Sequence, residues 1–112
     1  MVGFKIKKMI NTLKKFFGLL PETDFRSEVK QGAVIVDVRT AMEYRLGHIK
    51  GSLNIPLQDL SHQISKIPKG KTIITCCASG IRSASAKGIL RKSGFENVHN
   101  GGGWQSLQSK IN

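Results

Sequence analysis

The sequence contains only two cysteines, and they are adjacent, at Cys76 and Cys77. Neighbouring Cα atoms lie about 3.8 Å apart, below the usual range of about 4.4–6.8 Å for a disulfide, so a bond between them would be strained. A disulfide-stapled secreted scaffold is therefore excluded. No C-x-x-C spacing occurs and the three histidines are scattered, so neither a metal site nor a cofactor is expected. The two cysteines are interpreted as thiols, which implies a reducing compartment and most simply the cytoplasm.

Long apolar runs and acidic residues are also scarce. No stretch approaches the roughly 18 uninterrupted apolar residues of a membrane span. Seven acidic residues stand against eighteen basic ones, which gives a formal net charge of +11. This balance favours anionic partners, and a small anionic substrate is the preferred interpretation. Nucleic acid is not expected, because no cluster of lysines and arginines is interleaved with aromatic residues.

The chain of 112 residues is long enough for one domain, and we divide it at Pro21. Residues 1–20 carry five lysines and no acid, and their apolar side chains recur at steps of three and four: Ile6, Met9, Ile10, Leu13, Phe16, Phe17 and Leu20. This pattern predicts a basic amphipathic helix. Three placements stay open for it: packing on the domain, lying on an anionic membrane surface, or serving as an arm that docks a partner or frays.

Residues 21–112 alternate between strand-like and helical patterns. Strands are expected at 33–38, 53–55, 71–76 and 96–99, and helices at 22–30, 40–46, 56–64, 83–93 and 104–111. The three glycines at 101–103 are expected to form a flexible turn. Alternating strands and helices predict an α/β fold with a central, mostly parallel sheet and helices on both faces. In such sheets, functional sites lie outside the carboxyl ends of the strands.

The most informative segment is a strand that ends at a cysteine and is followed by a short loop and a helix. Such a loop can point its backbone N–H groups inward as a nest, and the helix adds the positive end of its dipole. Together with Arg82, both features would hold an anion and lower the pKa of a cysteine at the base of the loop, whose thiolate is the nucleophilic form. Gly80 suits a positive φ, and Ser83 suits a helix N-cap. The plainer interpretation is a buried cysteine that ends a strand, with Arg82 on the surface.

Four segments, in order along the chain, resemble the motifs of the rhodanese family, which comprises the thiosulfate sulfurtransferases and related persulfide carriers. Residues 77–83 are similar to the active-site pattern C-x-x-G-x-R-S. Residues 37–44 resemble D-x-R-x-x-x-E-[YF], residues 47–56 resemble G-H-I-x-G-[AS]-x-N-I-P, and residues 94–104 resemble G-F-x-x-V followed by G-G-[WY]. The matches cover about residues 30–107. Four motifs at compatible spacing are a specific signal.

The resemblance implies that residues 21–112 form a rhodanese-like domain and that Cys77 cycles through a persulfide. Its thiolate would take the sulfane sulfur from thiosulfate or a similar anion and pass it to a thiol or a protein cysteine. The implied substrate-binding residues are Ala78, Ser79, Gly80, Ile81, Arg82 and Ser83. Most of these contacts would come from backbone amides, while Arg82 would hold the donor anion.

The resemblance gives other matched residues structural roles. Asp37 is expected to accept hydrogen bonds from the loop near the site, and Arg39 is expected to pair with Glu43. His48 belongs to a structural turn in the family pattern, and Trp104 is interpreted as a packing residue.

Two rival functions stay open beside the sulfurtransferase. Cys76 and Arg82 also have the C-x5-R-[ST] spacing of cysteine-dependent phosphatases, and one branch of these shares the rhodanese fold with a loop one residue longer. The other rival is a non-catalytic rhodanese-like docking module. The position of Gly80 favours a loop counted from Cys77, as does Thr75, which stands where phosphatases usually have histidine. On this interpretation Cys76 is the last strand residue and packs within the sheet.

Overall fold

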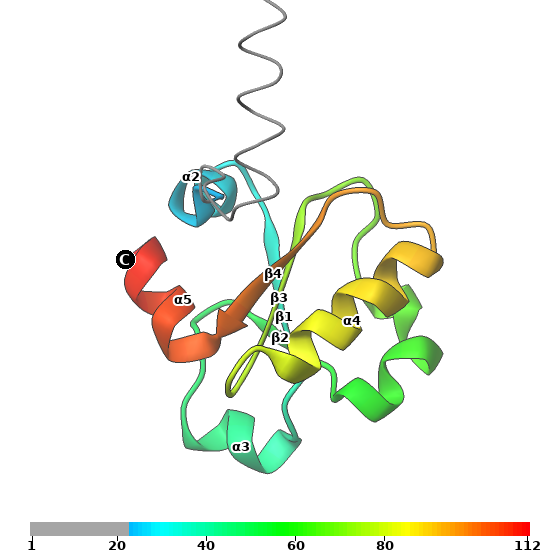
Figure 1. The fold of residues 1–112 in the computed structure, drawn as a ribbon, viewed down its shortest axis with the longest axis horizontal. Coiled ribbons are helices and arrows are strands. Elements are labelled where there is room, and N and C mark those ends of the chain that lie inside the picture. Colours follow the sequence, from blue (N-terminus) through cyan, green and yellow to red (C-terminus); the bar gives the residue numbers. More distant parts are fainter. Residues whose placement is uncertain (1–22) are drawn as a thin grey trace, which may run out of the picture.

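Four parallel strands form the centre of the computed structural model, which describes residues 23–112 (Figure 1). The strands are β1 (Val34–Asp37), β2 (Leu53–Asn54), β3 (Ile73–Cys77) and β4 (Val98–Gly103), in the spatial order β2-β1-β3-β4. Each neighbouring pair is parallel. The segment 1–20, for which the sequence predicts an amphipathic helix, lies outside the described residues.

Helices cover both faces of the sheet, which confirms the predicted α/β fold. On one face α2 (Phe25–Lys30) packs beside α5 (Trp104–Ile111). On the other face lies α4 (Ile81–Lys92), together with the 3₁₀ segments η1 (Leu57–His62) and η2 (Ile64–Lys66). The short helix α3 (Ala41–Leu46) follows β1 and lies beyond its carboxyl end. Among the described residues, no helix is both long and apolar enough to cross a membrane.

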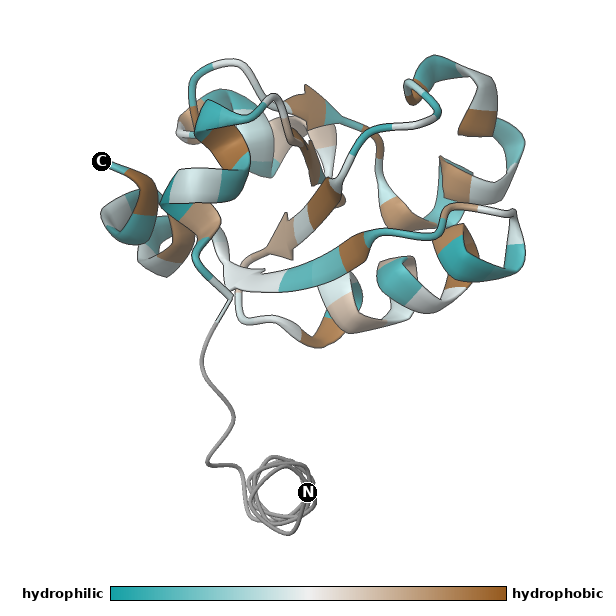
Figure 2. Cartoon of the chain, turned by 90° about the horizontal axis from the view of Figure 1, so that it is seen from above, coloured by the Kyte–Doolittle hydropathy of each residue, from teal (hydrophilic) through white to brown (hydrophobic). Residues whose placement is uncertain are grey.

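The side chains of β3 divide the hydrophobic core in two, because successive residues of a strand point to opposite faces. Ile73 and Cys77 belong to the cluster under α4, and Ile74 and Cys76 belong to the cluster under α2 and α5. The first cluster also contains Val36, Val38, Ile55, Leu60, Ala86, Leu90 and Val98, and the second contains Phe25, Ile35, Ile49 and Leu107. In Figure 2, brown hydrophobic segments occur on the inner strands, whereas the foremost strand, β4, is largely teal and white because it contains His99, Asn100 and three glycines. The two adjacent thiols therefore lie on opposite sides of the sheet.

Two element boundaries near the loop differ from the sequence prediction. β3 ends at Cys77 rather than Cys76, because Cys77 still pairs with Gly103 of β4 after an irregularity in the register. α4 begins at Ile81 rather than Ser83, because its N-cap is Gly80, with φ +104°. Glycine adopts this left-handed conformation without steric cost, so the chain enters the helix two residues earlier.

The segment that begins at Pro56 also departs from its predicted form. It folds as the two 3₁₀ segments η1 and η2 rather than as one α-helix. Neither segment has a side-chain hydrogen bond at its N-cap, and η1 buries Leu60 against the α4 face of the sheet. This segment is therefore stabilised by packing against the rest of the domain and not by helical propensity. A sequence pattern does not specify such packing.

The glycines at 101–103 form the end of β4 and not a flexible turn, so this prediction was wrong. A Cβ on Gly101 would lie 2.8 Å from both Ile74 Cγ2 and Thr75 O, and a Cβ on Gly103 would lie 2.9 Å from Ala78 O. These distances are shorter than real Cβ contacts. Glycine is therefore required because β4 approaches β3 and the loop after it closely.

We predict opposite effects of two Gly→Ala substitutions on the free energy of unfolding. Gly101→Ala should lower it by about 1–3 kcal/mol, because the methyl group meets backbone and packed side chains. Gly88→Ala should raise it by about 0.4–1 kcal/mol, because Gly88 lies within α4 and a methyl group there would meet no other atom within 4 Å. Urea denaturation measures both. Equal stability of Gly101→Ala and the unsubstituted chain would show that β4 can shift to make room.

Candidate active site

The thiol of Cys77 is surrounded by donors from the loop that follows β3. Its Sγ accepts hydrogen bonds from the backbone N–H of Gly80, at 2.9 Å, and of Ser83, at 3.4 Å. Cys77 is 1% exposed and sits below the N-terminus of α4. The loop turns tightly enough to do this because Gly80 has a positive φ. The site is thus a small nest of amides with a sulfur atom at its base.

The pKa values of the two neighbouring cysteines are shifted in opposite directions. Burial raises the pKa of Cys77, but hydrogen bonds from Ser83 and from the amides of Gly80 and Ser79 outweigh burial, so its pKa lies below the ordinary thiol value. Cys76 is fully buried on the other face of the sheet, where burial and then the charge of Asp37 raise its pKa. The thiolate, which is the nucleophilic form, is therefore favoured at Cys77 and disfavoured at Cys76.

Ser83 links the thiol to Asn100, a residue that the sequence analysis did not select. The thiol of Cys77 donates to Ser83 Oγ at 3.4 Å, and Ser83 Oγ donates to Asn100 Oδ1 at 2.6 Å. Asn100 also accepts from the N–H of Gly102 and donates to the carbonyl of Gly80. Asn100 therefore connects β4 to Gly80 in the loop and to Ser83 in the first turn of α4. The only signal in the sequence was its place beside the glycine run.

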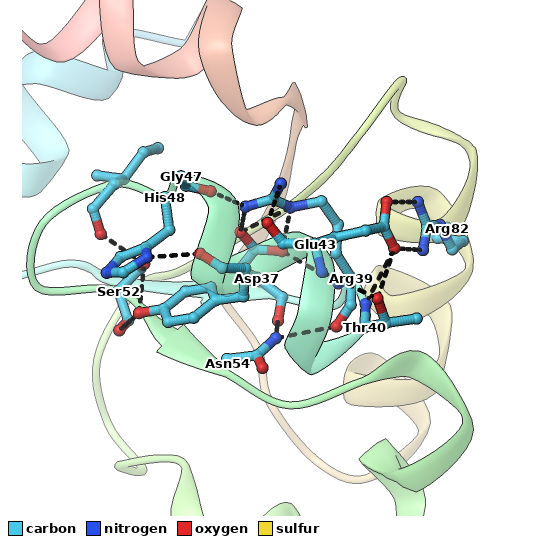
Figure 3. A network of polar contacts seen from close by, with 11 residues as sticks. Asp37, Arg39, Thr40, Glu43, Gly47, His48, Ser52, Asn54 and Arg82 are labelled. Carbon is cyan, nitrogen blue, oxygen red and sulfur yellow. Dashed lines mark hydrogen bonds and ion pairs between the residues drawn. The ribbon is translucent and has the colours of Figure 1, made fainter.

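The charge of Arg82, which was expected to hold the donor anion, is paired with a carboxylate in this structure. Its guanidinium forms two hydrogen bonds with the carboxylate of Glu43 in α3, at 2.7 and 2.9 Å (Figure 3). Glu43 also completes the capping box of α3 with Thr40. The hydrogen bonds from Arg82 and then from Thr40 lower the pKa of Glu43 to about 2, so Glu43 is ionised and the ion pair is formed at neutral pH. The pair joins α3 to the first turn of α4.

Arg39 pairs with Asp37 and not with the carboxylate of Glu43, which corrects the expectation from the sequence. The ion pair is buried, with 2.7 Å between Arg39 Nη2 and Asp37 Oδ2. The same guanidinium donates to the carbonyls of Glu43 and Gly47 and lies 4.7 Å from the centre of the Trp104 ring. Arg39 thereby connects β1 to the middle and the C-terminal end of α3 (Figure 3) and, through Trp104, to the start of α5. Trp104 has the packing role that was expected of it.

The other predicted site residues lie around the nest without touching the sulfur through their side chains. Ala78 and Ser79 are exposed on the loop, and Ile81 is the first residue of α4, with 77% of its surface exposed. His48 is exposed, stacks on Tyr44 and places its Nδ1 2.7 Å from the carbonyl of the same residue. His48 thus has a structural role, as expected, but it precedes the turn at Lys50 and Gly51 and is not part of it. In the described part of the chain, no three His, Cys, Asp or Glu side chains are grouped as metal ligands.

This arrangement suits Cys77 Sγ to act as a nucleophile. Amide donors and a hydroxyl surround one low-pKa thiol, and the N-terminus of a twelve-residue helix adds a partial positive charge. The same donors would stabilise any anionic group attached to Cys77. They come from the loop and the first turn of α4, and Asn100 of β4 holds Ser83, so the anion site depends on how these segments meet.

Comparisons with known proteins are consistent with this geometry. Thiosulfate sulfurtransferase PspE of Escherichia coli is 35% identical over 74 residues, which are 64% of this chain and 71% of that protein. The tRNA uridine(34) hydroxylase of Bacillus cereus is 31% identical over 105 residues, which are 88% of this chain but 33% of that protein. A solved rhodanese with anions from Escherichia coli superposes with a TM-score of 0.63 at 32% identity, covering 67% of this chain and 91% of that one. The family model described as rhodanese-like domain matches residues 22–110, so the chain belongs to the rhodanese family.

Proposed function

We propose that the protein is a sulfurtransferase that moves a sulfane sulfur from thiosulfate or a similar anion to a thiol acceptor through a persulfide on Cys77. One observation carries the proposal: the low-pKa sulfur of Cys77 lies inside the ring of donors from Gly80 and Ser83. The similarity to a thiosulfate sulfurtransferase supports the choice of donor.

In the first half of the reaction, the Cys77 thiolate attacks the outer sulfur of thiosulfate. A new S–S bond forms at Cys77, the S–S bond of thiosulfate breaks, and sulfite leaves with that electron pair. The product persulfide is also an anion, so the amides that stabilise the thiolate stabilise it as well. In the second half, the acceptor attacks the outer sulfur and Cys77 leaves as a thiolate. We place this chemistry in a reducing compartment, most simply the cytoplasm, because it needs free thiols.

The geometry favours this function over a phosphatase that would use Cys76 as its nucleophile. Cys76 packs under α2 and α5, on the face of the sheet away from the donors of the loop, whereas Cys77 accepts hydrogen bonds from them. A nucleophile must be both ionised and adjacent to the anion site, and Cys76 meets neither condition. A docking module would not require a cysteine with a lowered pKa at the centre of the nest.

We predict that Cys77→Ser abolishes persulfide formation and that Cys76→Ser retains most of it. After treatment with thiosulfate, mass spectrometry should find about 32 Da of added sulfur on the peptide that contains Cys77 in the chain with Cys76→Ser. Far-UV circular dichroism checks that both variants are folded. Sulfur added at Cys76, or a dead Cys76→Ser variant beside an active Cys77→Ser variant, would contradict the proposal and favour the phosphatase register.

The rate at which iodoacetamide alkylates Cys77 should follow the thiolate and therefore rise with pH through the pKa of this group. Because that pKa is lowered, the midpoint should lie at lower pH than for a free cysteine. Ser83→Ala should move the midpoint upward, because the hydroxyl of Ser83, which accepts from the neutral thiol, can turn to donate to the thiolate and stabilise it. Ser85→Ala, the same change at an exposed position of α4, should leave it in place. An unchanged midpoint in Ser83→Ala would mean that the backbone amides alone set the acidity.

The ion pair between Arg82 and Glu43 allows a test of whether Arg82 attracts the donor. Arg82→Ala should lower kcat/KM for thiosulfate by roughly tenfold, whereas Glu43→Gln should raise it severalfold, because it removes the carboxylate that competes with the donor. Each variant should lower the free energy of unfolding by less than about 1 kcal/mol, since the pair is partly exposed. If both variants lower kcat/KM, Arg82 serves to brace α3 and does not bind the donor.

A further inference from the structure

Three large hydrophobic side chains are exposed among residues 23–112, and all three belong to α3 or to the start of α4, which the ion pair between Glu43 and Arg82 joins. They are Met42, with 68% of its surface exposed, Leu46, with 87%, and Ile81, with 77%. Met42 and Leu46 are one turn apart on α3, and Ile81 begins α4. We call these three residues the rim surface. Exposed apolar side chains that gather at one place on a protein indicate an interaction site.

The ion pair between Glu43 and Arg82 holds the two parts of the rim surface together. Glu43 follows Met42 in the sequence, and Arg82 follows Ile81, so the contact at 2.7 Å brings α3 to the start of α4. A hollow of about 540 Å³ adjoins the pair. Its lining includes Thr40, Ala41, Pro56, Leu57 and Arg82. The surface next to the nest is therefore partly apolar and partly concave, as a docking site requires.

The charges near the rim surface favour an acidic partner. Arg45 lies on α3 next to Leu46, and Lys50 lies in the turn after α3; both are exposed. Neither forms an ion pair with a carboxylate among residues 23–112, and the acid of α3, Glu43, is occupied by Arg82. Asp59, in the lining of the hollow, is an opposing carboxylate that forms no ion pair among residues 23–112. Two cations, Arg45 and Lys50, against this one anion leave the charge of the region positive. It would attract a surface that carries aspartate or glutamate.

We propose that the rim surface docks a protein acceptor whose reactive cysteine is flanked by apolar and acidic residues. This inference rests on the proposed function, because it names the acceptor of the Cys77 persulfide. The acceptor thiol attacks the outer sulfur, a new S–S bond forms on the acceptor, and the bond to Cys77 Sγ breaks. Cys77 leaves as a thiolate, and the proton of the acceptor thiol passes to the new persulfide. No oxidant or reductant is consumed.

Two other occupants of the rim surface are disfavoured by charge. Residues 1–20 of this chain have apolar side chains at helical spacing, but they carry five lysines and no acid. A second copy of the chain would also bring a strongly basic surface, because the formal net charge is +11. Like charges at an interface oppose association. Met42 and Leu46 lie about 6 Å apart along the helix axis. A small thiol cannot contact both side chains at once, so it gains little binding energy from them.

Synthetic peptides provide the test. Two twelve-residue peptides carry one central cysteine, which is flanked by leucine and glutamate in the first and by serine and lysine in the second. The full-length protein is loaded with thiosulfate, and sulfur transfer to each peptide, to glutathione and to cyanide is measured. The acidic apolar peptide should have a kcat/KM at least tenfold above that of the basic peptide and of glutathione. Equal values for the two peptides would overturn the proposal.

Variants of α3 show whether the preference comes from the rim surface. Met42→Ser combined with Leu46→Ser should lower transfer to the acidic peptide by about tenfold and leave transfer to cyanide unchanged. Arg45→Gln should weaken transfer to the same peptide severalfold. Arg91→Gln, which removes the same charge from the last turn of α4, should have no effect. An equal loss with Arg91→Gln, or loss of cyanide transfer in the α3 variants, would contradict docking at this surface.

A binding measurement separates this inference from the proposed function. A labelled acidic peptide with serine in place of its cysteine should bind the full-length protein, and Met42→Ser with Leu46→Ser should weaken that binding by about tenfold. If cyanide receives no sulfur from the loaded protein, the proposed function fails. If cyanide receives sulfur but the peptide neither binds nor is preferred, the rim surface is not a docking site.

Discussion

The buried ion pair between Asp37 and Arg39 is the interaction on which the site depends. Asp37 has no exposed surface, and its carboxylate binds both the backbone N–H and the guanidinium of Arg39. Breaking a buried pair by removing one partner typically costs about 3–5 kcal/mol, because the remaining charge loses its compensation. Here the remaining donors of Arg39 hold the carbonyls of Glu43 and Gly47, so the pair also fixes α3 at the carboxyl edge of the sheet.

The position of α3 then determines what surrounds Cys77. Glu43 can reach Arg82 only because α3 is held beside the first turn of α4, and the loop between Cys77 and Arg82 is therefore tied at both ends. The glycines of β4 let the loop and Asn100 approach from the other side. The acidity of Cys77 thus results from Ser83, Gly80 and Ser79, and contacts from β4 and α3 hold the segment that carries these donors. None of these contacts requires a long or specialised insertion.

The sequence predicted those parts of the structure that depend on local pattern. The apolar run at 33–38 contains β1 (Val34–Asp37), and the helix at 104–111 has the predicted bounds. Gly80 has the predicted positive φ. Contacts between distant residues were not predictable, and Arg82 meets Glu43 across 39 positions. The glycines at 101–103 were misassigned for the same reason: glycine locally favours turns, but here the close approach of β3 and Ala78 excludes larger residues.

The opposite orientations of the two cysteines have a consequence for oxidative damage. A sulfenic acid at a reactive cysteine is rescued most readily by a nearby thiol that condenses with it to form a disulfide. Cys76 is adjacent in sequence, but it is buried on the other face of β3, in the core cluster that contains Leu107 and against which Trp104 packs. It cannot resolve an oxidised Cys77 without disrupting the sheet. Recovery from the first step of oxidation therefore depends on thiols supplied from outside the domain, and peroxide exposure in their absence would drive Cys77 toward irreversible acids.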